Sequence, residues 1–447
     1  MSTWIEKWTP EDDGFWKNEG SRIAWRTLII TTLTLILSFA TWFMVSAIAV
    51  KLPGIGFNFT KDQLFWLTAM PGLAAGLLRT VHTFLLPIFG SRHVITIATI
   101  IKLIPVLGLG LAVMDPNTPY WVFLILAFTA GFGGGDFSSY MPSTSLYFPK
   151  RLQGTALGIQ AGIGNFGVSV AQFMTPAFLG VATVGAAQTF TKVDSQTKEV
   201  IGTSEIYLQS AAFWYAPLLV ILAILSWMLI RSVPVKASFK EQLDIFKDKH
   251  TYFCTVTYLM TFGGFSGLAA IFPLLIKTIY GDFADAPDPL KYAFLGPLIG
   301  AGSRVLFGFV ADKVGGAILT TFTGIGLIIG SIAMVQMGLL TPTSVEQFPA
   351  FLYTMLGLFF VTGVGNAATF RQYPIIFGHN PRQAAGVIGF TAAIAAFGPF
   401  LFATSVSAVM SATGNANNFF YGLVAFAILA TAINWWYYNR PGCERPS

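Results

Sequence analysis

Charged residues are scarce in this sequence. Only 10% of its 447 residues are Asp, Glu, Lys or Arg, and 54% are hydrophobic, whereas soluble domains carry about 25% charged residues. A soluble core could not bury so much apolar side chain, but a lipid bilayer accepts it directly. The composition therefore excludes an ordinary soluble enzyme and predicts a membrane protein.

Residues that hold metals or carry out redox chemistry are also few. The two cysteines, Cys254 and Cys443, and the four histidines show no metal-ligand spacing, so we expect no metal site, no cofactor and no structural disulfide. No G-x-x-x-x-G-K-[ST] loop is present, which argues against ATP-driven transport. The net charge of +6 is too small to indicate nucleic-acid binding. Without a catalytic cluster, we expect the chain not to be an enzyme.

Long hydrophobic runs dominate what is present. A helix needs about 20 predominantly apolar residues to cross a bilayer, and twelve segments meet that need. Five acidic residues precede the first of them, so we expect no cleavable signal and a first run that stays as an anchor. The predicted fold class is an all-α membrane protein with twelve transmembrane helices. These spans lie near 27–50, 63–89, 94–114, 120–142, 155–182, 206–230, 251–279, 290–311, 317–339, 349–376, 384–410 and 416–438.

Basic residues gather on one side of the predicted membrane. With both chain ends on the same side, the inner segments hold sixteen Lys and Arg and the outer segments six. The positive-inside rule then predicts a multi-pass protein of the inner (plasma) membrane with both termini cytoplasmic. The basic segment 232–250 has Phe239, Leu243 and Phe246 at helical spacing, which predicts an amphipathic linker helix on the cytoplasmic face.

The sequence repeats itself. A shift of 225 residues places Arg79 on Arg304 and Gly90 on Gly315, and a shift of 232 aligns the fourth span with the tenth. Two six-helix halves repeated in parallel are typical of major facilitator transporters, in which a pseudo-two-fold axis relates the halves and the substrate binds between them. The pairs at a shift of 232 are Gly131 and Gly363, Gly133 and Gly365, Pro142 and Pro374, Pro149 and Pro381, Lys150 and Arg382, and Gly154 and Gly386.

A short loop motif adds to the repeat. Residues 308–316, which include Asp312 and Lys313, resemble the cytoplasmic loop motif of major facilitators; the matching loop of the first half lacks the acid. The expected organisation is a cytoplasmic N-terminal segment, a first six-helix half, the linker helix, a second six-helix half and a cytoplasmic tail. Their expected ranges are 1–26, 27–231, 232–250, 251–438 and 439–447.

Ionisable residues inside the spans are the candidate functional residues, because each costs at least about 2.5–3.5 kcal/mol at the bilayer centre. They are Arg79, Lys102, Asp136, Arg304 and Arg371. The two arginines that the repeat makes equivalent, Arg79 and Arg304, are expected to meet across the central cavity with an anion between them, since a guanidinium donates paired hydrogen bonds to an oxyanion. The alternative, in which each arginine satisfies backbone carbonyls at a helix break, stays open.

Glycines and asparagines cluster in the fifth and tenth spans. Small residues allow helices to approach closely, and packing explains most of these glycines. Asn165, which follows Gly164, and Asn366 are not required by packing, and an amide offers a ligand both a donor and an acceptor. We therefore expect both asparagines near the substrate.

These motifs resemble those of the bacterial nitrate/nitrite porter family of the major facilitator superfamily. Residues 154–170 resemble its first nitrate signature and residues 363–374 its second, and segments 8–16 and 56–64 match as well. The resemblance implies transport of nitrate and nitrite by alternating access, with the anion clamped between the two arginines.

The resemblance also implies the residues of the pocket. A ring that the first span contributes in some members is replaced here, where Met44-Val45-Ser46 stands, so that wall of the pocket is undefined. The predicted substrate-binding residues are Arg79, Arg304, Asn165, Tyr258, Phe137, Phe262, Gly164 and Asn366.

Two coupling modes remain open. In the first mode, nitrate enters and nitrite leaves, so the carrier never has to reorient with two positive charges in an empty cavity. Asp136 could instead carry a proton in nitrate symport, or form an ion pair with Lys102 or Arg371. An anion channel is a distant alternative. The expected partners are nitrate, nitrite and the lipid bilayer, and we expect a monomer.

Overall fold

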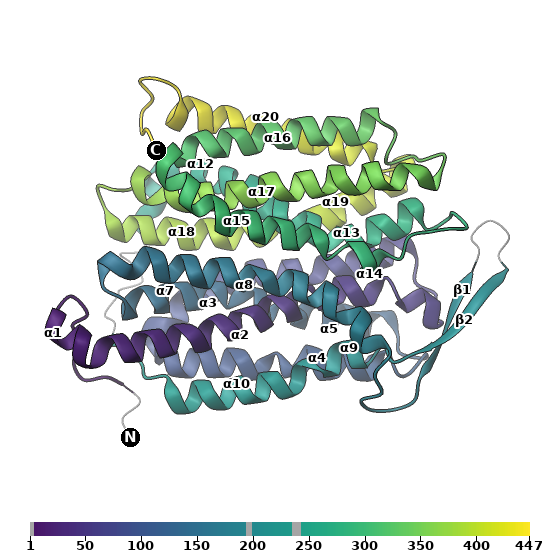
Figure 1. The fold of residues 1–447 in the computed structure, drawn as a ribbon, viewed down its shortest axis with the longest axis horizontal. Helices are drawn as coiled ribbons and strands as arrows, with labels where there is room; N and C mark the ends of the chain where they lie inside the picture. The colour runs from purple at the N-terminus through teal and green to yellow at the C-terminus, as the bar shows by residue number, and fades with distance from the viewer. Residues whose placement is uncertain (1–3, 194–198, 235–242) are drawn as a thin grey trace.

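The computed structural model describes residues 4–193, 199–234 and 243–447. It consists of long helices in two stacked bundles, coloured purple to teal and green to yellow in Figure 1. The first half contains α1 (Asp13–Phe15), the π-helix η1 (Trp16–Gly20), α2 (Ser21–Ala49), the 3-10 helix η2 (Leu52–Ile55), α3 (Lys61–Ile101), α4 (Leu103–Ala112), α5 (Tyr120–Ala130), α6 (Phe132–Gly135), α7 (Phe137–Tyr147), α8 (Lys150–Leu179), α9 (Ser210–Phe213) and α10 (Tyr215–Leu229).

The second half is built in the same way. Its elements are η3 (Leu243–Lys247), α12 (Lys249–Tyr258), η4 (Leu259–Gly263), α13 (Gly264–Tyr280), α14 (Pro289–Tyr292), α15 (Leu295–Val314), α16 (Gly316–Gln336), η5 (Val345–Gln347), α17 (Phe348–Ile376), α18 (Pro381–Ala395), α19 (Gly398–Thr413), α20 (Asn417–Asn434) and η6 (Trp435–Asn439).

The predicted twelve-helix fold is confirmed. In the described residues, eleven helical segments are long and apolar enough to cross a membrane. The remaining span is α8, whose 30 residues measure about 45 Å. It is less apolar because Gln160, Asn165 and Gln172 occupy it, and all three are buried. The polar side chains of α8 therefore lie inside the protein rather than against lipid.

The internal repeat is visible in the backbone. Gly90 interrupts α3 with a φ of 75°, and Gly315 separates α15 from α16 with a φ of 100°. Positive φ is readily adopted only by glycine. The pair predicted to be equivalent thus forms the same tight turn in each half.

Close helix approach is repeated too. A Cβ atom on Gly131 would lie 2.2 Å from the carbonyl oxygen of Pro71, and a Cβ on Gly363 would lie 2.1 Å from that of Gly300. Pro71 belongs to α3, which carries Arg79, and Gly300 belongs to α15, which carries Arg304. Glycine is therefore required where the fourth and tenth spans press against the arginine-bearing spans.

A β-hairpin was not expected from the sequence. Strands β1 (Gln188–Val193) and β2 (Val200–Ile206) pair antiparallel between α8 and α9. The hairpin projects from the end of the molecule opposite both termini (Figure 1). Its Phe190 ring packs where a Cβ on Gly54 would lie, 2.1 Å away. We call this the hairpin end, and the end that carries both termini the terminal end.

The predicted linker helix is described only in part. Residues 235–242, including Phe239, lie outside the described residues. The part that is described forms the 3-10 turn η3, after which α12 begins at Lys249. The first span begins earlier than predicted, at Ser21 rather than residue 27. Arg26 lies within this helix and donates a 2.8 Å hydrogen bond to the carbonyl oxygen of Leu229.

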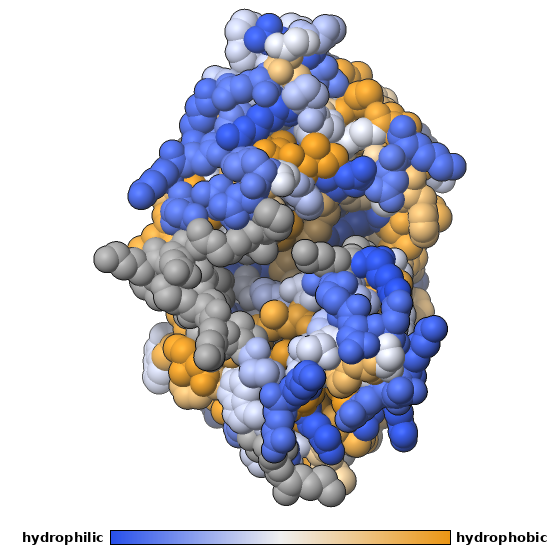
Figure 2. Space-filling model, turned by 90° about the vertical axis from the view of Figure 1, so that its left-hand side faces the viewer, coloured by the Kyte–Doolittle hydropathy of each residue, from blue (hydrophilic) through white to orange (hydrophobic). Residues whose placement is uncertain are grey.

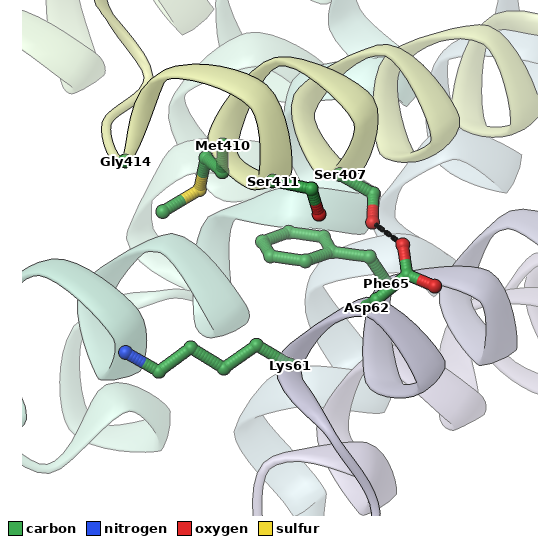
Figure 3. Close-up of a pocket in the computed structure, with 7 residues that line it drawn as sticks. All are labelled: Lys61, Asp62, Phe65, Ser407, Met410, Ser411 and Gly414. Atoms are coloured by element: carbon green, nitrogen blue, oxygen red, sulfur yellow. Dashed lines mark hydrogen bonds between the residues drawn. The ribbon is translucent and has the colours of Figure 1, made fainter.

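Two polar contacts between the halves lie at the hairpin end. The ammonium of Lys51 is 3.2 Å from the carboxylate of Asp288, and Ser407 donates a hydrogen bond to Asp62. Asp62 and Ser407 line a cavity of about 260 Å³ between α3 and α19, shown in Figure 3. Figure 2 looks onto the terminal end and shows a hollow between the two halves. The halves are thus joined at one end and separated at the other.

Candidate functional site

Arg79 is fully buried at the centre of the interface. Its Nε donates a 2.8 Å hydrogen bond to the carbonyl oxygen of Gly134, and its Nη1 donates a 2.6 Å bond to that of Ala392. Gly134 lies in α6, where the fourth span is broken, and Ala392 lies near the end of α18, where the eleventh span is broken. The carbonyl oxygen of Ala392 also accepts the backbone N–H of Ala396, so Arg79 adds a second hydrogen bond there. The alternative role of satisfying carbonyls is therefore part of what Arg79 does.

Aromatic rings surround this guanidinium. Its central carbon lies 4.9 Å from the ring centre of Phe137, 5.1 Å from that of Phe262 and 5.5 Å from that of Trp42. Trp42 of α2 thus contributes a ring from the first span, whose share of the pocket wall the sequence left undefined. Sequence alone pointed to Met44, but packing of α2 against its neighbours turns Trp42 toward Arg79.

Arg304 occupies the facing position in the second half. It is 5% exposed, and its central guanidinium carbon lies 4.8 Å from the ring centre of Phe370. Phe370 in turn lies 6.2 Å from Phe137 and 5.6 Å from Tyr258 between ring centres, and Tyr258 stacks on Phe262 at 5.5 Å. A continuous set of rings therefore connects the two arginines. Sequence reasoning missed Phe370, although it lies within the second signature-like run.

Several buried polar atoms on the arginine-bearing span α15 and on the spans α8 and α17 have no hydrogen-bond partner in the described part of the chain. They include Nη1 of Arg304 and both the nitrogen and oxygen of the Asn165 and Asn366 side chains. An unsatisfied buried polar group costs about 1–3 kcal/mol, so such atoms are rarely left in one place without a reason. Donors outnumber acceptors in this set, and an anion with several oxygens could accept from them.

Gly164 has a different role from the one predicted. A Cβ on this residue would lie 2.7 Å from a methyl carbon of Leu35 on α2. Where the sequence predicted a substrate contact, the structure shows a packing contact that lets α8 approach α2. Asn165, the next residue, keeps its amide unpartnered.

Asp136 lies beside the arginine site as part of a buried ion pair. Its carboxylate pairs with the ammonium of Lys102 and accepts a 2.6 Å hydrogen bond from Ser38. Both charged side chains are essentially inaccessible to solvent. Of the two partners that the sequence left open, Lys102 is the one in contact.

Arg371 lies elsewhere. Its Nε is 2.7 Å from the carboxylate of Asp312, and its side chain is 42% exposed. The interpretation of Arg371 as a partner of Asp136 is therefore wrong. Phe370 and Arg371 are consecutive on α17 and therefore point in different directions. Phe370 contacts Arg304, whereas Arg371 pairs with Asp312 in the loop motif at the end of α15.

Sequence reasoning also missed His82. The imidazole Nδ1 lies 3.9 Å from the Asp136 carboxylate and 3.0 Å from the hydroxyl of Ser139. The available signal was spacing, since His82 follows Arg79 by three residues on one helix and residues three apart share a face.

Two six-helix halves around a central cationic site define a secondary transporter of the major facilitator kind. The model of the Major Facilitator Superfamily matches residues 31–401. A solved structure of a bacterial homolog to the human lysosomal transporter Spinster shares the fold, with a TM-score of 0.66 over 94% of this chain and 97% of that chain at 16% identity.

Two relatives narrow the class. "Probable nitrate/nitrite antiporter NarK2" of Thermus thermophilus is 54% identical over 99% of this chain and 98% of its own length. "Nitrate/nitrite transporter NarU" of Escherichia coli is 36% identical over 98% of this chain and 96% of its own. The chain belongs to the nitrate/nitrite porter family of the Major Facilitator Superfamily.

Proposed function

We propose that this protein transports nitrate and nitrite by alternating access and that it exchanges one anion for the other. The observation that carries the proposal is a set of buried polar atoms on Arg304, Asn165 and Asn366 that have no hydrogen-bond partner in the described residues. The relatives that are named as nitrate/nitrite transporters support the same substrates.

The ring-lined site suits a small, flat monoanion. Phe137 and Phe262 both approach Arg79, and Phe370 approaches Arg304, so apolar surfaces bound the space beside each guanidinium. Arginine donates paired, coplanar hydrogen bonds, which match the planar oxygens of nitrate and nitrite. Sulfate or phosphate would bring more charge and require more donors than this set offers.

Exchange follows from the charge of the empty site. Two buried guanidinium groups without an anion repel each other in a medium of low dielectric constant. The bond from Arg79 to the carbonyl of Ala392 also holds the first half to the second. An empty carrier would have to break this bond without compensation, whereas an anion bound at Arg79 would replace it. The free-energy barrier to reorientation is therefore lower for the carrier with bound nitrite than for the empty carrier.

Proton-coupled nitrate symport is the second candidate. The buried pair of Asp136 with Lys102 favours a structural role for this carboxylate, since protonating it would leave a buried ammonium without its partner. Symport through Asp136 alone is thus the weaker proposal. The imidazole of His82, whose Nδ1 lies 3.9 Å from the Asp136 carboxylate, is a second group that could bind a proton beside the anion site.

We further propose that the protein lies in the inner (plasma) membrane as a monomer with both termini cytoplasmic. The excess of basic residues in the segments at the terminal end supports this orientation, because cytoplasmic loops are enriched in Lys and Arg. The hollow in Figure 2 would then open to the cytoplasm.

Counterflow in proteoliposomes tests the function. Vesicles with purified protein are loaded with nitrite, with chloride or with nothing added, and labelled nitrate is supplied outside at equal pH on both sides. Exchange predicts rapid uptake only into the vesicles that contain nitrite. Equal uptake into empty vesicles would contradict exchange, and uptake that requires an inward proton gradient would favour symport.

A further inference from the structure

His82 lies between the anion site and the buried ion pair. It is on the same face of α3 as Arg79, one turn nearer the terminal end, and its side chain is 11% exposed. The Asp136 carboxylate lies 3.9 Å from its Nδ1, and the hydroxyl of Ser139 lies 3.0 Å from the same atom. The side chains of Lys102 and Asp136 are only 0% and 1% exposed. The imidazole is therefore the part of this cluster that solvent reaches.

The charged groups that act on the imidazole come from three elements. Arg79 lies on α3 itself, Asp136 at the junction of α6 and α7, and Lys102 between α3 and α4. Tyr140 of α7 faces the same carboxylate. Lys102 and Asp136 neutralise each other, so a proton on His82 would change the net charge of the cluster from zero to +1. Histidine is the side chain type that makes such a change near neutral pH.

We propose that His82 is a proton-binding site that is linked to anion binding at Arg79. The proposal rests on the proposed function, since it needs an anion at Arg79. Without an anion, burial of the imidazole opposes a proton on it, as do the charges of Lys102 and Arg79, and only Asp136 favours it. When a monoanion neutralises Arg79, this opposition falls and His82 takes up a proton from water in the hollow. When the anion leaves, the proton returns to solvent.

The linkage is reciprocal. If a bound anion strengthens proton binding at His82, then a bound proton strengthens anion binding by the same factor. Couplings of this kind are typically 5- to 150-fold, and a charge within one helical turn in a low-dielectric site predicts about a tenfold effect. Anion affinity should therefore rise as the pH falls through the range in which histidine titrates. In nitrate/nitrite exchange the proton would accompany each anion, so the cycle would carry no net proton.

Calorimetry on the full-length protein in nanodiscs tests the linkage. Nitrate is titrated at about pH 8 and about pH 6, each in two buffers of different ionisation enthalpy, so that both the affinity and the number of protons taken up are measured. The variants are His82→Gln and, as a matched control, His93→Gln. His93 is half-buried on α3 beyond Gly90, where its ring packs against Trp227 and Nδ1 lies 3.2 Å from the carbonyl oxygen of Phe89.

The expected result is about tenfold tighter nitrate binding at the lower pH with proton uptake, both lost in His82→Gln and both kept in His93→Gln. Unchanged pH dependence and proton uptake in His82→Gln would overturn the proposal, and so would absence of proton uptake in the unmodified protein. The second measurement does not depend on the folding of any variant. Nitrate binding without proton uptake would contradict the linkage at His82 but not the proposed function. Absence of nitrate binding would contradict both.

Discussion

The Nη1 atom of Arg79 donates a 2.6 Å hydrogen bond to the carbonyl oxygen of Ala392. An arginine from α3 of the first half is thus bound to the backbone of α18 in the second half. An anion that takes the guanidinium for itself competes with this bond, which makes substrate binding and the movement of the halves parts of one equilibrium.

Replacing either arginine by lysine should weaken nitrate binding. Arg79→Lys and Arg304→Lys keep the positive charge but lose the planar fork of donors, and we expect nitrate Kd to rise at least about tenfold, which corresponds to one lost charge-assisted hydrogen bond of about 1.5–3 kcal/mol. Calorimetric titration measures the change. Arg151→Lys is the control, because Arg151 pairs with Asp13 at the surface. Unchanged affinity in both central variants would exclude the clamp.

Replacing Asn165 or Asn366 by leucine should weaken nitrate binding without lowering the stability of the fold. Asn165→Leu and Asn366→Leu remove buried polar atoms that have no hydrogen-bond partner in the described residues. Replacing such atoms by an apolar group of similar size is neutral or stabilising. We expect an equal or higher Tm without anion, together with nitrate binding weakened about tenfold or more.

Asn434 provides the matched control for these variants. Its amide bonds to Gln372, Ala317 and Thr321 within the second half, so Asn434→Leu should cost about 1–3 kcal/mol of stability. Thermal unfolding in detergent compares all three variants. If Asn165→Leu and Asn366→Leu lower the Tm as much as Asn434→Leu, the two amides have structural partners and the prediction fails.

Two glycines should tolerate no side chain. Gly131→Ala and Gly363→Ala would place a Cβ 2.2 Å and 2.1 Å from backbone carbonyl oxygens, and backbone cannot move aside cheaply. Overpacking of this kind costs about 1–3 kcal/mol or more, so yield and Tm should fall in both. Gly158→Ala is the control, since nothing lies within 4 Å of its added Cβ. Equal losses in all three variants would show that close approach is not the cause.

The ties at the hairpin end should bias the protein toward the closed state at that end. Asp288→Asn weakens the ion pair with Lys51 and Ser407→Ala removes the bond to Asp62. Met410 lines the cavity between α3 and α19 (Figure 3), so labelling of Met410→Cys by a membrane-impermeant thiol reagent reports opening.

We expect each tie variant to label up to about fivefold faster, because a partly exposed pair contributes about 0–1 kcal/mol. The same measurement with Asp285→Asn, an exposed residue of the loop before α14, controls for lost surface charge. No change in either tie variant would mean that other contacts hold this end closed.

The C-terminal tail should remain docked down to acidic pH. Hydrogen bonds from Lys249 at 2.8 Å and His250 at 3.0 Å lower the pKa of Glu444 from 4.5 to about 2. Because this pKa is lowered in the docked state, the stabilisation is complete above about pH 4.5 and is lost as the pH falls toward about 2. A spin label on Pro446→Cys should stay immobile from neutral pH to about 4.5 and become mobile below it, whereas Glu444→Gln should be mobile throughout. Immobility in Glu444→Gln at every pH would refute the link.

Much of the architecture was predictable because a bilayer imposes simple rules. A helix must span a fixed thickness with apolar residues, so the twelve runs followed from hydropathy, whereas the exact ends of the helices did not. The shift that aligned Gly90 with Gly315 also predicted a turn that both halves share, because only glycine adopts it readily. The β-hairpin was missed because it lies in a polar loop, where membrane rules do not apply.

The candidate site was predictable only in its charges. Arg79 and Arg304 were found because charge inside a membrane is costly and therefore rare. Trp42 and Phe370 were not found because aromatic rings are common in such spans. His82 was not found because a histidine can be neutral near pH 7 and was not counted as a charge inside the membrane. Their roles depend on which face of each helix turns inward.

The sequence by itself determined the class of this protein, its spans, its repeat and its two central arginines, because hydrophobicity, charge and repetition are properties of the chain. Only the tertiary structure decided the partners. It paired Asp136 with Lys102 and Arg371 with Asp312, and it set Trp42 beside Arg79. Such pairings depend on the rotation of each helix about its axis, and that rotation is fixed by close packing against the neighbouring helices.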